Sequence, residues 1–355
     1  MNYKDEFHDL LAIVIKENAS DLHIAVGRHP MIRVDGGLVP LLTREVVTPE
    51  ISEGLVKAIL TPEQLTVFQA EQEIDFSYDF NGKARFRANV YLQRAFHGAA
   101  LRLIPSKIST FAELNLPLIL EDFCKRPQGF LLIVGPTGHG KTTTLASMVD
   151  YINHSRNDHI ITVEDPIEYV FASDLALVDQ REVGLDTHSF AKALRSMFRQ
   201  DVDVAMIGEM RDPETISIAV TAAETGHLIF STLHTNNAAQ TIDRIIDSFP
   251  AAQQSQIRAQ LASTLIGIVS QRLVPRINGG LIPAVEVMLA SSAVRNLIRE
   301  NKSHEIDLVI ETSSDSGMVS LNRSLVDLIR RGEITVENAM AYSLNPNELQ
   351  LLLRR

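Results

Sequence analysis

Apolar and polar positions alternate in short runs through the first hundred residues, which predicts a small sheet with a few helices. Apolar residues between Leu10 and Ile15 predict a short helix with one apolar side. Strands are expected within 21–26, 31–40 and 74–93, and helices near 48–60 and 62–72. Turn residues at 35–37 and at Asn81-Gly82 predict two hairpins.

The run 83–93 has a period of two residues, which separates two faces of a strand. One face would carry Ala84, Phe86, Ala88, Val90 and Leu92, and the other Arg85, Arg87, Asn89, Tyr91 and Gln93. A third arginine, Arg102, follows on a later apolar run. The predicted sheet therefore presents arginines on the side away from its apolar face.

From residue 130 onward, apolar strands alternate with helical patterns, which predicts an α/β unit with a mainly parallel sheet covered by helices. The expected strands are 130–134, 160–163, 204–207 and 228–232, and the chain beyond about residue 290 is expected to be helical. The stretch between the two halves has two prolines and several polar breakers. We therefore predict an N-terminal domain at 1–104, a linker at 105–117, and a second domain at 118–355 with C-terminal helices over about 290–355.

Composition narrows the class of protein. At about 150 residues per domain, 355 residues correspond to roughly two domains, and 45% hydrophobic residues exclude a disordered chain. The net charge of −11 argues against a general nucleic-acid coat. The single cysteine, Cys124, excludes disulfide frameworks and four-cysteine zinc sites. Since no run reaches about 18 apolar residues and no signal peptide is apparent, we expect a soluble, intracellular protein.

Residues 135–142 read Gly-Pro-Thr-Gly-His-Gly-Lys-Thr, which satisfies the phosphate-loop pattern between an apolar strand and a helix. Glycines let the backbone N–H groups wrap a phosphate at the helix N-terminus. Lys141 would reach the β- and γ-phosphates and the Thr142 hydroxyl would ligate Mg²⁺. The expected cofactors are thus ATP and Mg²⁺, and the expected binding residues are Gly135, Pro136, Thr137, Gly138, His139, Gly140, Lys141, Thr142 and Thr143. The side chain of His139 is interpreted as tolerated, because only its backbone is needed.

Two further apolar strands end in carboxylates. Residues 205–212 place Glu209 where a Walker B acid would hold Mg²⁺, partly through water. Residues 161–168 place Glu164 and Glu168 after another strand. Because parallel strands present their C-terminal ends at the edge that carries the phosphate loop, Glu164 is the preferred general base, with Glu168 in reserve. The alternative is that these carboxylates are only polar residues that face water at the ends of the strands.

Histidines flank another buried strand, with His227 before it and His234 after it. Two histidines alone rarely make a zinc site, and no third ligand follows at metal spacing. A polar group at a strand C-terminus can sense bound phosphate by hydrogen bonding, so His234 is the expected sensor. A structural role is the alternative.

Together these segments resemble the secretion ATPase superfamily of RecA-like ring motors, most closely the PilT-like type IV pilus retraction ATPases. The matching boxes are Walker A at 135–142, the aspartate box at 161–168, Walker B at 194–212 and the histidine box at 225–236; the segments 19–24, 270–276 and 293–299 also match. The resemblance implies a small PAS-like α+β domain followed by a RecA-like P-loop ATPase domain with a helical tail. The lone cysteine and the early start of the matching strand favour retraction over extension motors.

The resemblance further implies a homohexamer in which Arg85, Arg87 and Arg102 close over the γ-phosphate, where an arginine finger is worth about 10³–10⁵ in kcat. A solvated strand face is the alternative for each arginine. Glu164, Glu209, Glu168, His234, His227 and the three arginines are therefore the expected catalytic residues, and Thr142 and Glu209 the metal ligands.

The function that follows is an ATP-hydrolysing motor for pilus retraction, pilin disassembly and twitching motility. Its expected place is the cytoplasmic side of the inner membrane at the pilus base, reached only through a membrane platform protein, with other pilus motor ATPases as further partners. The alternatives are an accessory pilus motor, a type II or IV secretion ATPase and, less favoured by the acidic charge, a DNA translocase. No nucleic-acid partner is expected.

Overall fold

The computed structural model describes residues 2–34, 36–105 and 107–354, which divide into two units. Unit 1 contains the chain up to Lys107 together with residues 166–170, and unit 2 contains residues 108–165 and the chain from Phe171 onward. The division falls inside the expected linker at 105–117, of which Ser106 lies outside the described residues. Asp35, in the first expected hairpin turn, also lies outside them.

Unit 1 is an antiparallel sheet with strand order β3-β2-β1-β6-β5-β4. Its helices begin at good N-caps: Asn2 for α1, and Thr48 and Thr61 followed by prolines for α2 and α3. Buried residues of α1 recur at Phe7, Leu10, Leu11 and Val14, the spacing of one helix face. The elements are α1 (Tyr3–Lys16), β1 (Asp21–Ile24), β2 (Met31–Val34), β3 (Gly37–Pro40), α2 (Pro49–Ile59), α3 (Pro62–Glu71), β4 (Glu73–Phe80), β5 (Ala84–Gln93) and β6 (Phe96–Ile104).

The hairpin predicted at Asn81-Gly82 joins β4 and β5, and both turn residues have the positive φ of the favoured two-residue turn (53° and 67°). The predicted alternation along β5 is confirmed where it meets the core: Phe86, Ala88 and Val90 are fully buried, while Arg87 is exposed. Leu92 is an exception, because it lies beyond the covered part of the sheet and is 37% exposed.

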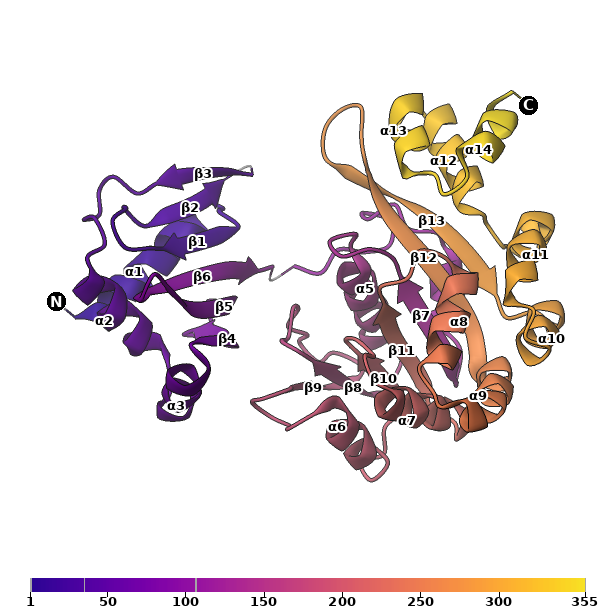
Figure 1. Cartoon of the computed structure of the whole chain (residues 1–355), viewed down its shortest axis with the longest axis horizontal. Helices are drawn as coiled ribbons and strands as arrows, with labels where there is room; N and C mark the ends of the chain where they lie inside the picture. Colours follow the sequence, from indigo (N-terminus) through magenta and orange to yellow (C-terminus); the bar gives the residue numbers. More distant parts are fainter. Residues whose placement is uncertain (1, 35, 106, 355) are drawn as a thin grey trace. The chain divides into compact units, whose positions relative to one another are not determined.

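Unit 2 is built on a seven-stranded sheet with strand order β13-β12-β7-β11-β10-β8-β9 (Figure 1). The pairs among β12, β7, β11, β10, β8 and β9 are parallel, and only β13 runs antiparallel to its neighbour. The strands are β7 (Gly129–Val134), β8 (His159–Glu164), β9 (Leu177–Glu182), β10 (Val204–Ile207), β11 (Leu228–Leu233), β12 (Leu265–Pro275) and β13 (Leu281–Leu289). The α/β class expected from the alternation of strands and helices is confirmed.

The central strands β7, β10 and β11 are buried along their whole length, as parallel strands covered on both faces must be. The helices of unit 2 are α4 (Ile119–Cys124), α5 (Lys141–Asn153), α6 (Phe190–Met197), α7 (Pro213–Glu224), α8 (Ala238–Asp247), α9 (Ala251–Thr264), α10 (Ser292–Arg299), α11 (Ile306–Thr312), α12 (Leu321–Arg330), α13 (Val336–Tyr342) and α14 (Pro346–Leu353). In the described part of the chain, no helix has the length and apolar character needed to cross a membrane.

Three strands of unit 2, β9, β12 and β13, are absent from the sequence prediction. The edge strand β9 carries mostly polar residues, and the apolar run 261–274 spans the end of α9 and most of β12. β12 and β13 form a long hairpin whose far end packs against α12, α13 and α14 (Figure 1). The helical tail expected beyond about residue 290 is confirmed, and this hairpin is what anchors it to the sheet.

Glu286 on β13 is a buried carboxyl at the junction of the hairpin with α8. Its Oε1 accepts hydrogen bonds from the Ala238 backbone N–H at 2.9 Å and from the Ser270 hydroxyl at 3.1 Å. It lines a small hollow together with the acids Asp307 and Glu348. Burial raises the pKa of Glu286 to about 7, although the hydrogen bond from the Ala238 amide favours the ionised carboxylate and lowers the pKa.

This raised pKa makes stability depend on pH in a definite direction. The unfolded chain releases the Glu286 proton near pH 4.5 and the folded chain near pH 7, so the folded state binds more protons between these values. Stability from this group is therefore complete below about pH 4.5 and is lost as pH rises through about 7. Glu286→Gln keeps the acceptor oxygen and cannot ionise. We expect the variant to match the parent at pH 4.5 and to exceed its unfolding free energy by up to about 3 kcal/mol at pH 8.

Urea unfolding at a series of pH values measures this difference. Glu337→Gln, at an exposed position of the same helical tail, is the matched control for the loss of a carboxyl group. A pH-independent offset for Glu286→Gln would contradict the assignment.

Candidate functional site

The phosphate loop connects the end of β7 at Val134 to the start of α5 at Lys141. Gly135 and Gly140 have φ values of +145° and +78°, which L side chains rarely adopt. A methyl group at Gly135 would collide with the Gln271 carbonyl, and one at Gly140 would lie 2.9 Å from Gln271 Nε2. The two glycines therefore allow both the curvature of the loop and its close approach to β12.

Gln271 holds the loop from the neighbouring strand. It is 2% exposed, its Oε1 accepts from the Thr144 hydroxyl at 2.7 Å, and its Nε2 donates to the His139 carbonyl at 2.8 Å. One side chain thus ties the loop and the first turn of α5 to the sheet. Gln271 was not among the site residues predicted from the sequence. Its polar side chain inside the apolar run 261–274 is the feature that could have indicated a buried hydrogen-bonding role.

The His139 side chain has a structural contact that the sequence analysis did not foresee. Its Nδ1 accepts a hydrogen bond from the Leu273 backbone N–H at 2.9 Å, and its ring lies edge-on to Tyr342. Burial lowers the pKa of His139, and the nearby charges of Arg272 and Lys141 lower it further. The ring is therefore held in the neutral form that can accept the Leu273 hydrogen bond.

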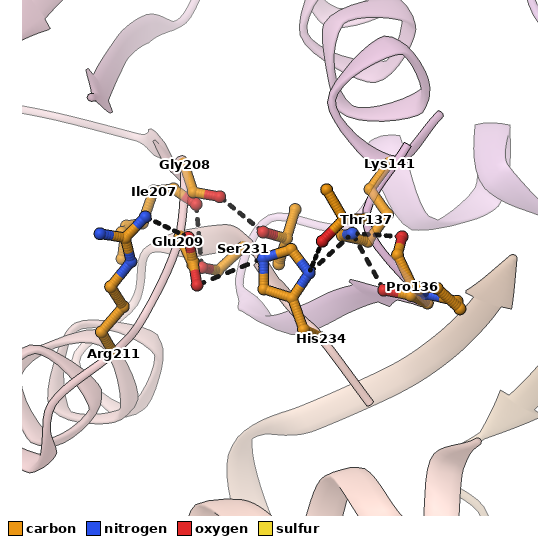
Figure 2. A network of polar contacts seen from close by, with 11 residues as sticks. Pro136, Thr137, Lys141, Ile207, Gly208, Glu209, Arg211, Ser231 and His234 are labelled. Atoms are coloured by element: carbon orange, nitrogen blue, oxygen red, sulfur yellow. Dashed lines mark hydrogen bonds and ion pairs between the residues drawn. The ribbon is translucent and has the colours of Figure 1, made fainter. Parts of the chain in front are cut away.

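Lys141 and His234 meet at the centre of the site (Figure 2). The Lys141 ammonium donates to the carbonyls of Gly135 and Pro136, each at 2.9 Å, and lies 3.2 Å from His234 Nδ1. Thr137 Oγ1 lies 3.3 Å from the same nitrogen. Because an ammonium group can only donate, Nδ1 accepts from it and the ring proton is placed on Nε2.

Glu209 lies on the other side of the His234 ring (Figure 2). Its Oε1 is 3.3 Å from His234 Nε2, and its Oε2 accepts from Arg211 Nη2 at 2.8 Å. Burial alone would raise the pKa of Glu209, but Arg211 and His234 outweigh it and leave the pKa below its usual value. Lys141, His234, Glu209 and Arg211 therefore form one chain of polar contacts from the phosphate loop to the Walker B segment.

The ends of β10 and β11 set the position of Glu209. The Ser231 hydroxyl donates to the Ile207 carbonyl at 2.9 Å, and the Thr232 hydroxyl donates to the Gly208 carbonyl at 2.6 Å. Both side chains belong to β11, whose last residue, Leu233, directly precedes His234. The Walker B acid and the histidine are thus held by the same pair of strands.

Glu164 ends β8 and is 3% exposed. Its Oε1 accepts from the Thr162 hydroxyl at 2.7 Å and from the Gln180 amide at 3.2 Å. β8 and β10 are parallel neighbours, so Glu164 and Glu209 leave the same edge of the sheet. Glu168, the reserve base, belongs to the segment 166–170 of unit 1, where it lies 3.8 Å from Arg87.

The three predicted arginines lie on neighbouring strands of unit 1, Arg85 and Arg87 on β5 and Arg102 on β6. Arg87 is paired across the ladder with Arg102, whose Nε donates to Asp21 at 2.9 Å. Their proposed approach to a nucleotide remains a prediction.

His227 is placed away from this group. It precedes β11, at the end opposite to His234, and six strand residues at about 3.3 Å each separate the two by roughly 20 Å. Its Nδ1 is 3.0 Å from the Ala222 carbonyl and its ring stacks edge-on against Phe198. The length of β11 therefore separates His227 from the phosphate loop of its own chain, and its catalytic role stays a prediction.

The residues at the loop fit a magnesium ion that takes most of its ligands from phosphate and water. Thr142, in the first turn of α5, and Glu209 are both oxygen donors, which is what Mg²⁺ prefers. Across residues 2–34, 36–105 and 107–354, no group of three His, Cys, Asp or Glu side chains is arranged to hold a metal by protein ligands alone.

Residues 5–280 match the Type II/IV secretion system protein family. The type IV pilus retraction ATPase PilT of Pseudomonas aeruginosa is 46% identical over 336 residues, which cover 93% of this chain and 96% of that protein. The type IV pilus ATPase PilU of the same organism is 40% identical over 98% of this chain and 91% of its own length. A crystal structure of the pilus retraction motor PilT with bound ADP superimposes with a TM-score of 0.91 at 44% identity, over 97% of this chain and 98% of that one.

The family match extends through both units and contains the segments 19–24, 135–142, 161–168, 194–212, 225–236 and 270–276. The chain belongs to the Type II/IV secretion system protein family and, within it, is closely similar to the type IV pilus retraction ATPases.

Proposed function

We propose that this chain binds and hydrolyses ATP and uses the energy to power retraction of a type IV pilus. The observation that carries the proposal is the contact chain from Lys141 through His234 to Glu209, because it joins a phosphate loop to a Walker B acid. The similarity to a pilus retraction ATPase over nearly the whole of both chains, and to a retraction motor with bound ADP, supports the substrate and the process.

Lys141 is the residue that holds the terminal phosphates. Its ammonium now donates to two loop carbonyls and to His234, and phosphate oxygens are stronger, charged acceptors for the same protons. Thr142 and Glu209 would hold Mg²⁺, which would neutralise charge on the phosphate oxygens. The backbone N–H groups from Gly138 to Lys141 wrap the phosphates at the N-terminus of α5.

Glu164 is the proposed general base for the attacking water. Thr162 and Gln180 both donate to its Oε1, which fixes the orientation of the carboxylate at the end of β8. A positioned base of this kind contributes about 10²–10⁴ in rate. Glu168 remains the second candidate, although its carboxylate faces Arg87.

His234 is the proposed sensor of the γ-phosphate. When Lys141 turns to phosphate, His234 Nδ1 loses the ammonium donor and keeps the Thr137 hydroxyl, while Nε2 keeps Glu209. The ring then changes partners without moving far, which passes the state of the loop to the end of β11. This exchange of hydrogen-bond partners would favour one of two conformations of an element that packs on this edge of the sheet.

For the assembly we propose a homohexamer in which Arg85, Arg87 and Arg102 complete the nucleotide site. A motor of this kind acts at the cytoplasmic side of the inner membrane through a pilus platform protein and alongside other pilus motor ATPases. An accessory pilus motor is the alternative function; the chain is also similar to a second type IV pilus ATPase, PilU.

Lys141→Ala removes the ammonium group that contacts phosphate. We expect ATP turnover to fall by at least about a hundredfold, because a preorganised charge on the transferred phosphoryl group is lost, while the assembly state stays unchanged. Phosphate release and light scattering measure the two properties. Lys125→Ala, which removes an exposed lysine paired with Asp122, is the matched control. Near-normal turnover in Lys141→Ala would disprove the site.

Glu164→Gln keeps the size of the side chain and its acceptor oxygen but removes the base. Turnover is expected to fall by about 10²–10⁴, with ATP affinity within a few-fold of the parent. Rapid-quench hydrolysis and equilibrium nucleotide binding separate the two effects. Glu168→Gln serves as the comparison, and equal loss of binding and hydrolysis in Glu164→Gln would move the base to Glu168.

Deletion of the gene tests the biological role. If the chain is the retraction motor, cells should lose twitching movement and carry excess surface pili, because assembly continues without disassembly. Retained movement with a reduced retraction force would favour the accessory motor. Loss of all surface pili would reject retraction in favour of assembly. Complementation with Lys141→Ala, which should not restore movement, is the control for ATP dependence.

A further inference from the structure

A stripe of basic residues runs along one face of α6 and the turn that follows it. Lys192, Arg195 and Arg199 recur at intervals of three and four residues, so they lie on the same face, and all three are exposed. The opposite face buries Ala193, Leu194 and Met197 in the core. This stripe lies outside the contact chain at the phosphate loop.

The stripe forms one wall of a hollow of about 560 Å³, and the edge strand β9 with the loop that follows it forms the other. Arg181 of β9 and His188 of the loop line this hollow as well. The volume is in the range of small-molecule sites, about 300–1,000 Å³. Four permanently cationic side chains therefore line a ligand-sized hollow in a chain whose net charge is −11.

The positive charge of the hollow is only partly compensated. Asp186, the acid in its lining, accepts from the Glu182 backbone N–H at 2.9 Å, and Arg195 forms an ion pair with Glu214. Within the described ranges, the side chains of Lys192 and Arg199 have no hydrogen bond or ion pair.

Arg181 adds a second, independent indication. Its Nη2 donates to the Asp186 carbonyl at 3.2 Å, whereas its Nη1 is shielded from solvent and has no hydrogen-bond partner in the part of the chain that the structure describes. A buried guanidinium nitrogen without an acceptor is costly. Arg181 therefore brings an unmet hydrogen-bond donor to the lining of the hollow.

We propose that this hollow is a second anion site, which binds a small ligand with two or more phosphate groups. Several uncompensated cations require more negative charge than one carboxylate supplies, and guanidinium forks match phosphate oxygens in geometry. An extended nucleic acid fits less well, because the net negative charge of the chain repels it outside the hollow. The site lies within unit 2 and is separate from the phosphate loop, so its ligand is a candidate regulator of the motor.

The test uses full-length Lys141→Ala protein in EDTA, in which the phosphate loop is disabled, and inorganic tripolyphosphate as the probe. Isothermal titration is expected to show one tripolyphosphate per chain. Adding Lys192→Ala and Arg199→Ala should weaken binding by about tenfold or more for each cation removed. Arg126→Ala, an exposed arginine of the same unit outside the hollow, should leave binding unchanged. Lys192→Glu alone gives an independent check if the paired variant unfolds.

Titration with ADP in the same protein identifies the source of the phosphates. ADP binding that is lost with Lys192 and Arg199 supports a nucleotide in the hollow, and tripolyphosphate binding that is lost with them while ADP binds more weakly supports an inorganic polyphosphate. No binding of either probe, or binding that survives the loss of Lys192 and Arg199, overturns the proposal. Competition by double-stranded DNA at equal phosphate concentration, with a steep fall at higher salt, also overturns it in favour of a nucleic-acid surface.

Discussion

The site depends on the position of a single ring, because His234 contacts both the phosphate-loop lysine and the Walker B acid. The ring can bridge them only while its Nδ1 faces an ammonium and its Nε2 faces a carboxylate. That arrangement requires β7, β11 and β10 to be parallel neighbours that end at the same edge. The order of the central strands is therefore a requirement of the chemistry as well as of the packing.

A second support comes from β12, which lies on the other side of β7. Gln271 fixes the loop from beneath, and the Leu273 amide holds the His139 ring. The loop is thus held between two strands, with its lysine turned toward β11 and its backbone resting on β12. Such a preorganised loop loses little entropy when phosphate binds, because its shape already exists.

Much of this could be predicted from the sequence, for identifiable reasons. The phosphate loop, Glu209 and Glu164 follow strands that are apolar throughout, and buried parallel strands leave that signature. β9 could not be predicted in this way, because an edge strand with residues such as Asp179 and Arg181 has no apolar run. Gln271 was missed because its role depends on a contact 127 residues away in sequence, with Thr144. His227 and His234 flank β11 as the sequence indicates, and the length of that strand separates His227 from the phosphate loop.

Neighbouring residues of β12 face different parts of unit 2. Gln271 meets the phosphate loop, Ser270 meets Glu286, and Val274 packs in the apolar cluster of the helical tail. A strand with hydrogen-bonded neighbours on both sides resists stretching and bending. We therefore expect β12 to move as a rigid element between the phosphate loop and the helical tail. A displacement of the strand at the loop would then also displace the strand at the tail. The terminal helices are in this sense mechanically part of the nucleotide site, although none of the contacts of Lys141, His234 and Glu209 described above involves them.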